Sequence, residues 1–294
     1  MKTSFHRLVL SAITSLLVAG TAHAVDPLPV VASFSILADL ARAVGGDSVS
    51  VTSLVGPDSD AHVFEPKPTD AKALLQSKLL LLNGLSFEPW AQKLSKSAGY
   101  KGETVVVSAG VPALKIKGET DPHAWQNPTN VMVYVKNIAK GLSKVDPVNA
   151  GTYQANADKY TLELQTLDAW AKEQISAIPV AKRKVITSHD AFGYFGIQHG
   201  VAFLAPQGMS TEIEPSAKQV AQLIRQIQRE KVKAVFVENI SNPKLLAQLS
   251  KDAGVTVGAS LYSDALSTAD KPGSTYLKMM RHNVLQLTAG MKQN

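Results

Sequence analysis

The most constraining feature of the sequence is the long stretch from Asp146 to Pro179, which has the pattern of a single α-helix. Asp146 is a favourable N-cap residue, Pro147 fits a first helical turn, and Pro179 ends the helix. Apolar residues recur at steps of three and four and form one stripe, made of Tyr153, Ala157, Tyr160, Leu164, Leu167, Ala171, Ile175 and Ile178. Such a helix would be about 45 Å long, more than one small domain needs.

Both flanks of this helix alternate between strand-like apolar runs and helix-like amphipathic segments. Before it, the predicted strands are Leu28–Ser35, Val49–Leu54, Lys78–Asn83 and Glu103–Val107, and the predicted helices are Ile36–Val44, Thr69–Gln76, Glu88–Ser97 and Asn130–Leu142. After it, the predicted strands are Lys184–Thr187, Val201–Leu204, Ala234–Val237 and Thr256–Ala259, and helices are predicted through Phe195 and over Ser216–Glu230, Lys244–Lys251 and Thr275–Thr288. This alternation is typical of open parallel sheets covered by helices.

We therefore predict an α/β protein of two lobes, each with a mostly parallel sheet flanked by helices. Residues 25–145 would form the first lobe, residues 146–179 a rigid linking helix, and residues 180–294 the second lobe. The alternative is one domain with a long surface helix, which the apolar stripe fits equally well. The strand–helix alternation on both sides favours the two-lobed interpretation.

The first 24 residues have the pattern of a secretory signal peptide. Lys2 and Arg7 supply the positive start, Leu8 to Gly20 the apolar run, and Ala22-His23-Ala24 a small-residue cleavage site. The run is too short to span a membrane. Its removal lowers the formal charge from +6 to +4, because two basic residues and no acidic ones are lost. With scattered lysines and no aromatic-basic patch, we expect no nucleic-acid partner.

Cysteine is absent from the sequence. An exported protein without cysteine has no disulfides and no cysteine for a lipid anchor, so we expect a soluble periplasmic protein, with a freely secreted one as the alternative. The same absence leaves imidazole and carboxylate groups as the donors for any metal site.

Three of the five histidines after the signal segment lie in polar loops at or after the carboxyl ends of predicted strands, where open α/β sheets bind ligands. They are His62, His123 and His189; the other two are His199 and His282. Each of the three has acids nearby in sequence that could hold its second ring nitrogen: Asp60 and Glu65, Asp121, and Asp190. Asp264 also follows a predicted strand. Three imidazoles and one carboxylate, two from each lobe, would complete a four-coordinate site in the cleft between the lobes.

The long spacings between these residues match no local metal-binding motif, and a lone loop histidine is more often structural. Glu238 also follows a strand toward the same cleft, where it either orients a ligand imidazole or caps a turn.

Four segments, in order along the chain, resemble the ligand segments of the cluster A-I solute-binding proteins, the zinc and manganese receptors of ABC importers. They are Asp60–Asp70 (DAHVFEPKPTD), Asp121–Trp125 (DPHAW), Ser188–Phe195 (SHDAFGYF) and Tyr262–Asp264 (YSD). The resemblance spans the chain after the signal segment and includes the long helix, which family members use as a backbone between their lobes. It implies that His62, His123, His189 and Asp264 are the metal ligands, and that the partner is the transmembrane permease of an ABC importer.

The third ligand position bears on the choice of metal. Manganese members of the family tend to carry glutamate there, whereas this chain has His189, as zinc members do. Many zinc members also have a histidine-rich loop between the first two ligands, but residues 63–122 contain no histidine. Three neutral nitrogens and one oxygen suit Zn²⁺, while Mn²⁺ prefers more oxygen. We therefore expect zinc, with manganese or iron as alternatives.

A second class of function is a zinc-dependent hydrolase. If Asp264 did not bind, three histidines and an open position would resemble a catalytic zinc site. The chain has no separate motif for a general base and no Gly-x-Ser-x-Gly elbow. We therefore expect a monomeric metal receptor and not an enzyme.

Overall fold

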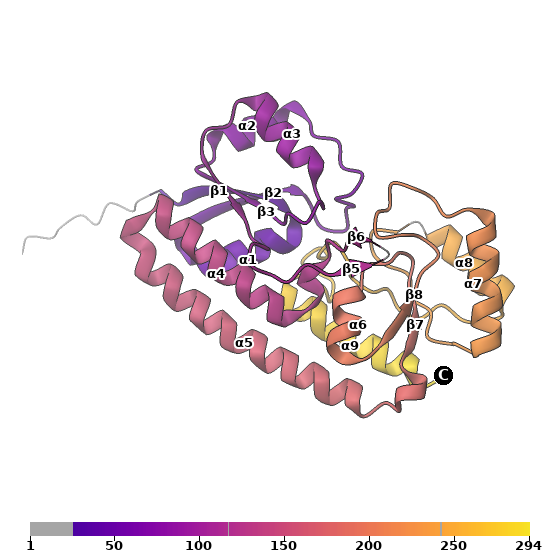
Figure 1. Ribbon diagram of the computed structural model, residues 1–294. Coiled ribbons are helices and arrows are strands. Elements are labelled where there is room, and N and C mark those ends of the chain that lie inside the picture. The colour runs from indigo at the N-terminus through magenta and orange to yellow at the C-terminus, as the bar shows by residue number, and fades with distance from the viewer. Residues whose placement is uncertain (1–25, 117, 242) are drawn as a thin grey trace, which may run out of the picture.

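The computed structural model describes residues 26–294 except residues 117 and 242 (Figure 1). The predicted signal peptide therefore lies outside the described residues. Two α/β lobes lie side by side, and the long helix α5 (Ala150–Ser176) runs beneath both of them (Figure 1). The two-lobed α/β fold predicted from the sequence is confirmed.

The first lobe is built on a parallel sheet with strand order β2-β1-β3-β4. These strands are β1 (Leu28–Phe34), β2 (Val49–Val55), β3 (Leu79–Leu82) and β4 (Glu103–Val106). Helices α1 (Ser35–Gly45) and α4 (Pro128–Val145) cover one face, and α2 (Pro68–Gln76) and α3 (Pro89–Ala98) lie on the other (Figure 1). All four residues of β3 are buried, as expected of a central strand covered on both faces.

A short antiparallel hairpin precedes the last helix of this lobe. It consists of β5 (Lys115–Ile116) and β6 (Glu119–Thr120), and a 3₁₀ turn, η2 (Ala124–Gln126), follows it. No strand was predicted from the sequence between Glu103–Val107 and the helix Asn130–Leu142, because strands of two residues leave no periodic signal.

The stripe predicted along the long helix faces the core. Its seven members within α5 are buried, and Ile178, just beyond the helix, is also buried. The helix contacts α1 and α4 in the first lobe and α6 (Gly193–His199) and α9 (Tyr276–Met291) further along. One apolar face therefore serves both lobes.

The ends of this helix differ from the predicted bounds. A 3₁₀ turn, η3 (Pro147–Asn149), precedes α5, and the Asp146 carboxylate accepts hydrogen bonds from Asn149 Nδ2 at 2.7 Å and from the Tyr153 hydroxyl at 2.5 Å. Asp146 thus secures the turn between α4 and α5 with its side chain instead of capping one continuous helix. At the other end, α5 stops at Ser176, ahead of Pro179. A proline disfavours the helical conformation in the residue before it, so the helix ends before that position.

The second lobe has a parallel pair of strands, β7 (Lys184–Ile186) and β8 (Ala202–Leu204), preceded by the 3₁₀ turn η4 (Val180–Lys182). The predicted strands near residues 235 and 257 continue this sheet only as isolated parallel bridges, from Ile186 to Val235 and from Val235 to Val257. Helices α7 (Ala217–Glu230) and α8 (Pro243–Ala253) lie on the outer side of the lobe (Figure 1). A separate small core forms there from Ile186, Leu223, Ile227, Val232, Val235 and Leu249.

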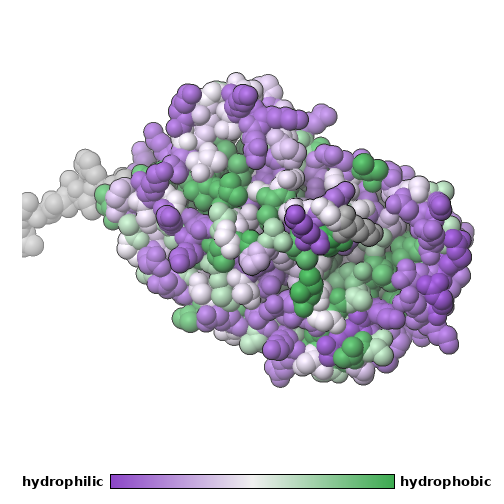
Figure 2. All heavy atoms as spheres, viewed as in Figure 1, coloured by the Kyte–Doolittle hydropathy of each residue, from purple (hydrophilic) through white to green (hydrophobic). Residues whose placement is uncertain are grey.

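The last helix, α9, packs against α1, α5 and β7, so it contacts elements of both lobes. Hydrophilic residues predominate over the outer parts of both lobes on the face shown in Figure 2, and hydrophobic residues show mainly in the area between them. A search of the described helices found no segment with the length and apolar character needed to cross a membrane.

The stripe of α5 can be tested with two leucines of the same helix. Leu164 is fully buried, whereas Leu162 is 63% exposed. We expect Leu164→Ala to lower the free energy of unfolding by about 3 kcal/mol, since it removes buried methyl groups and leaves a cavity. Leu162→Ala should change it by less than about 0.5 kcal/mol. Urea unfolding followed by circular dichroism measures both; similar losses would contradict the assigned buried face.

Candidate metal centre

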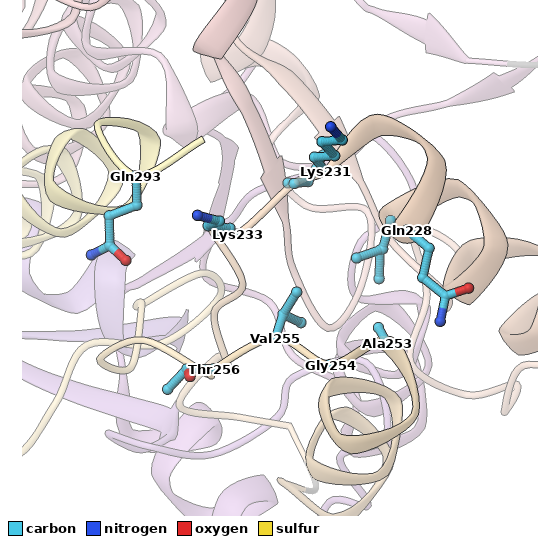
Figure 3. A pocket seen from close by; sticks show the side chains of 10 residues that line it. Gln228, Lys231, Lys233, Ala253, Gly254, Val255, Thr256 and Gln293 are labelled. Carbon is cyan, nitrogen blue, oxygen red and sulfur yellow. The ribbon is translucent and has the colours of Figure 1, made fainter.

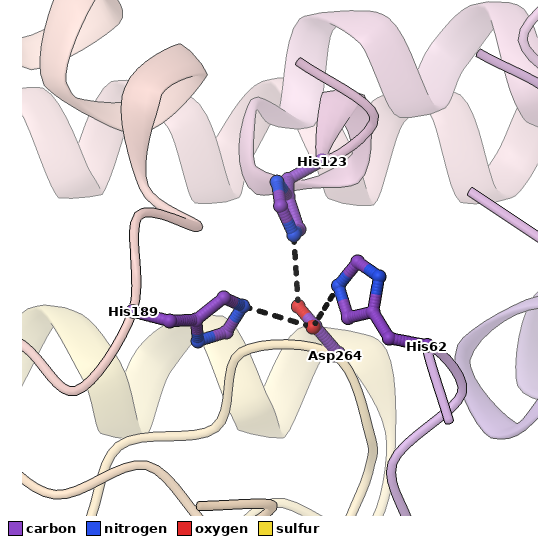
Figure 4. Close-up of side chains that lie close together, drawn as sticks. All are labelled: His62, His123, His189 and Asp264. Carbon is purple, nitrogen blue, oxygen red and sulfur yellow. Dashed lines mark hydrogen bonds and ion pairs between the residues drawn. The ribbon is translucent and has the colours of Figure 1, made fainter. Parts of the chain in front are cut away.

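Three imidazoles and one carboxylate that lie far apart in the sequence meet between the two lobes. They belong to His62, His123, His189 and Asp264, whose potential ligand atoms all lie within 4.8 Å of one another (Figure 4). The structure thus brings together the four residues singled out from the sequence. The other two histidines in the described part of the chain lie elsewhere: His199 ends α6, and His282 lies within α9.

The fold positions each member at the end of an element. His62 follows β2, and His189 follows β7, so both lie beyond the carboxyl ends of parallel strands. His123 lies between β6 and η2, and Asp264 lies in the segment that leads to α9. Carboxyl ends of parallel strands are the usual place for ligands in open α/β sheets.

The three imidazoles converge on the carboxylate of Asp264 (Figure 4). Its Oδ2 lies 3.2 Å from His62 Nε2 and 3.1 Å from His189 Nε2, and its Oδ1 lies 3.6 Å from His123 Nε2. Four ligands at the usual zinc distances of about 2.0–2.1 Å are separated from one another by about 3.3 Å in a tetrahedron. The three separations around Asp264 are close to that value, and the other ligand atoms lie within 4.8 Å of one another, so the four residues could hold an ion once the imidazole nitrogens close around it.

Two of the imidazoles are held from behind by carboxylates. Asp121 Oδ1 lies 2.7 Å from His123 Nδ1, and Glu238 Oε2 lies 2.5 Å from His189 Nδ1. Each carboxylate also accepts a hydrogen bond from the main-chain N–H of the same histidine, at 2.9 Å in both cases. The Asp121 carboxylate favours a proton on His123 Nδ1, and both carboxylates lie behind the rings, so that Nε2 of each imidazole is directed toward the cluster, as metal-ligating histidines require.

Of the acids near the histidines in sequence, only some act in this way. Asp121 does so as expected, while Asp60 accepts a hydrogen bond from the main chain of His62 at 2.9 Å instead of contacting its ring. Glu238, for which two roles were open, contacts His189 and is fully buried. Its role could not be read from spacing, because it depends on the bridge between Ile186 and Val235 that brings the two segments together.

Aromatic rings enclose the cluster on the side of the first lobe. The ring of Phe87 lies 4.8 Å from that of His62, and the ring of Trp125 lies 5.3 Å from that of His123, between centroids. Trp125 is fully buried. This apolar wall excludes water and strengthens electrostatic interactions within the cluster.

The charges within the cluster shift the pKa values of its members strongly. Burial by itself lowers the pKa of His123, but the negative charges of Asp264 and Asp121 outweigh that effect and raise the pKa to about 9. The pKa of His189 is likewise raised, against the effect of burial, by Glu238 and Asp264. Burial would raise the pKa of Asp264, yet the charges of His123 and His189 hold it well below its usual value. The cluster therefore favours positive charge around a buried carboxylate.

Several donor and acceptor atoms of the cluster have no hydrogen-bond partner within the described part of the chain. They are His62 Nε2, His123 Nε2 and Asp264 Oδ1, which lie where the imidazoles meet the carboxylate, and His189 Nδ1, which faces Glu238; all four are buried. Buried polar atoms are rarely left unsatisfied. Nitrogen and oxygen atoms that face one another without hydrogen bonds fit a cation between them.

A cavity of about 530 Å³ in the second lobe is chemically different (Figure 3). It lies between the end of α7, the end of α8 and the last residues of the chain, and its lining includes Lys231, Lys233 and Gln293. It contains no carboxylate or imidazole, and its two lysines would repel a cation. It is therefore not a metal site.

Two α/β lobes joined by a helix, with a buried cluster of potential ligands between them, define the class of extracytoplasmic solute-binding proteins. The family model described as "Zinc-uptake complex component A periplasmic" matches residues 30–290, and the chain belongs to this family.

Relatives in this family are named for different metals. The chain is 33% identical over 276 residues to the manganese-binding lipoprotein MntA of Halalkalibacterium halodurans, a match that covers 93% of this chain and 92% of the relative. It is 34% identical over 277 residues to the iron ABC transporter substrate-binding lipoprotein MtsA of Streptococcus pyogenes serotype M1, covering 90% and 89%. Among solved structures, the periplasmic zinc-binding protein TroA of Treponema pallidum superposes with a TM-score of 0.87 at 29% identity, covering 90% of this chain and 99% of that one.

The chain is thus a substrate-binding component of a metal ABC transporter and acts outside the cytoplasm, with the permease and ATPase of the importer as its partners. The family consists of transporter solute-binding proteins, not enzymes, which sets aside the hydrolase interpretation.

The raised pKa of His123 predicts how the stability of the metal-free protein depends on pH. A histidine whose pKa rises from about 6.5 when unfolded to about 9 when folded stabilises the protein fully below pH 6.5, and this stabilisation is lost as pH rises through 9. We expect the free energy of unfolding, measured in urea with a chelator present, to fall between pH 7.5 and 9.5. Asp264→Asn should reduce the fall, because the charge that stabilises the imidazolium is removed.

The pH window is chosen to avoid a second buried group. Burial raises the pKa of Glu88 to about 7, so the contribution of this carboxyl changes mainly between its unfolded value of 4.5 and pH 7. A wild-type profile that is flat or rising above pH 7.5 would show that His123 is not held in its protonated form.

Proposed function

We propose that this protein captures a divalent transition metal, zinc in preference to manganese or iron, through His62, His123, His189 and Asp264, and delivers it to the permease of its importer. The observation that carries the proposal is the convergence of three imidazole nitrogens on one buried carboxylate at separations suited to a tetrahedral ion. The metal is the cargo of the protein, bound for delivery and not for catalysis.

The donor set supports zinc as the preferred cargo. Three nitrogens with one carboxylate favour Zn²⁺ over Mn²⁺, which takes more oxygen ligands. Both oxygens of Asp264 face imidazoles, Oδ2 toward His62 and His189 and Oδ1 toward His123. If both oxygens bound the ion, the site would become five-coordinate, and this geometry would favour manganese or iron over zinc.

We further propose that the protein acts as a monomer, free in the periplasm after cleavage behind Ala24. The absence of cysteine from the 294 residues supports this location. The names of the relatives MntA and MtsA as lipoproteins point the other way. We also propose domain limits at residues 25–145 for the first lobe, 146–179 for the linking segment that contains α5, and 180–294 for the second lobe.

Metal titration of the chelator-stripped protein tests the proposed site. We expect one zinc ion per chain and a higher melting temperature with zinc, since binding to the native state alone stabilises it by about 4 kcal/mol at a thousandfold excess over the dissociation constant. If four ligands share about 10–16 kcal/mol of binding, His123→Gln should weaken affinity roughly a hundredfold. His282→Gln, which removes an imidazole outside the cluster, is the matched control. Equal effects of the two substitutions would refute the assigned ligands.

The selectivity of the site can be tested at His189. His189→Glu replaces a nitrogen donor by a carboxylate, so manganese should lose less affinity than zinc, or gain affinity. Zinc can still bind more tightly than manganese in absolute terms, because divalent zinc binds most protein sites more strongly than divalent manganese does. The quantity to compare is therefore the zinc association constant divided by the manganese association constant, both measured by competition titration in one buffer. A ratio that is unchanged or higher in the variant would show that His189 does not set the preference.

A further inference from the structure

The four cluster residues are not shared equally between the lobes when their main-chain contacts are considered. Asp264 belongs to the second lobe in sequence, but its segment is also bonded to the first lobe. Ser263 O accepts hydrogen bonds from Trp125 Nε1 at 2.9 Å and from Gln126 Nε2 at 2.7 Å. The segment that carries Asp264 is thus fixed to the residues next to His123.

Two more hydrogen bonds fix the same segment further along. Leu266 N–H donates to Ser35 Oγ at 2.9 Å, and Leu266 O accepts from Asp58 N–H at 2.8 Å. Asp58 lies in the turn that leads to His62. The same segment also reaches the second lobe, where Leu261 forms a bridge with Glu238 and Ala265 O accepts a hydrogen bond from Asn239 Nδ2 at 3.2 Å. Asp264 itself is flanked by Ser263 and Leu266, both of which are bonded to the first lobe, the lobe that carries His62 and His123.

His189 is anchored differently. Its main chain and ring are held by Glu238 of the second lobe, and it forms a parallel bridge with Gln207. The N–H of the next residue, Asp190, donates to Gly208 O at 3.2 Å. His189 and Asp190 thus contact the segment 207–213, which we call the strap, through their main chain.

The strap reaches across to the first lobe at Thr211. The Thr211 hydroxyl donates to Asp60 Oδ2 at 2.6 Å, while Oδ1 of the same carboxylate accepts from the main-chain N–H of His62 at 2.9 Å. Gln207 holds the strap in shape, because its Nε2 donates to Thr211 O at 2.9 Å and to Ile213 O at 3.2 Å. One carboxylate therefore joins the loop of His62 to the segment that positions His189.

The strap also forms one wall of the access route to the cluster. A pocket of about 210 Å³ reaches His62 and is lined by Phe87 and Pro122 on the first lobe and by Met209, Ser210 and Glu212 on the strap. His62 retains 7% exposure, whereas His123, His189 and Asp264 have none. Displacement of the strap would widen this pocket and move His189 in the same step.

We propose that Asp60 and Thr211 are positioning residues that set the rate of metal release: their hydrogen bond keeps the strap and His189 in place, and when it opens His189 leaves first while His62, His123 and Asp264 stay together. This inference rests on the proposed function of the cluster. It differs from that proposal in giving the four ligands unequal roles.

Metal dissociation tests the positioning role. Zinc-loaded full-length protein is mixed with excess chelator in a stopped-flow instrument, and the dissociation rate is compared between wild type, Thr211→Val, Thr211→Ser and Thr166→Val. Losing a hydrogen bond to a charged group should raise the rate in Thr211→Val by about tenfold. Thr211→Ser keeps the hydroxyl and should restore the wild-type rate. Thr166→Val removes a hydroxyl that bonds Leu162 O at 2.9 Å within α5, and should have no effect.

A second comparison tests the unequal roles of the ligands. His189→Ala leaves His62, His123 and Asp264 together, whereas His123→Ala removes one of these three. We therefore expect the His189→Ala variant to bind zinc at least about tenfold more tightly than the His123→Ala variant. A Thr211→Val rate equal to wild type, or equal affinities of the two alanine variants, would overturn the inference while leaving the proposed function intact. A wild-type protein that binds no zinc would overturn both.

Discussion

The arrangement between the lobes depends on one buried negative charge, the carboxylate of Asp264. A buried carboxylate is strongly destabilising unless positive charge and hydrogen bonds surround it. Here His62, His123 and His189 supply those contacts, and Asp121 and Glu238 fix the rings of the latter two. Protons and a metal cation can play the same electrostatic role at this point. The pKa shifts of the metal-free cluster and its capacity to bind a cation therefore have a common origin.

Much of the fold could be predicted from sequence because its signals are local. The stripe along α5 and the fully buried strand β3 arise from residue periodicity and apolar runs, and the structure buries both. What failed was the local detail that depends on tertiary contacts. Asp146 bonds Tyr153 instead of capping a continuous helix, and the segments near Val235 and Val257 pair through single bridges. A side-chain contact or a bridge of one residue leaves no periodic pattern.

The site was predictable to a different extent. Histidines after strands suggested the cluster, but the choice of all four members came from the resemblance of their segments to a known family, not from spacing. The pairing of Glu238 with His189 and that of Asp60 with Thr211 join residues brought together only by the folded chain. Sequence order also suggested two ligands from each lobe. The hydrogen bonds of Ser263 and Leu266 show that the segment of Asp264 is bonded to the first lobe as well as to the second, where Leu261 forms a bridge with Glu238.

Metal preference has to arise within a shared fold. Relatives at 33–34% identity are named for manganese and iron, and a protein named for zinc superposes over 90% of this chain. The scaffold alone therefore does not select the ion. The remaining variables are the donor atoms and how closely they can approach. Asp264 can offer one oxygen or two, whereas each imidazole offers one nitrogen, fixed in direction for His123 and His189 by the carboxylates behind them. Because His189 is the imidazole that the second lobe contributes, its replacement by a carboxylate would change the ratio of nitrogen to oxygen around the ion, and thereby which metal the same fold favours.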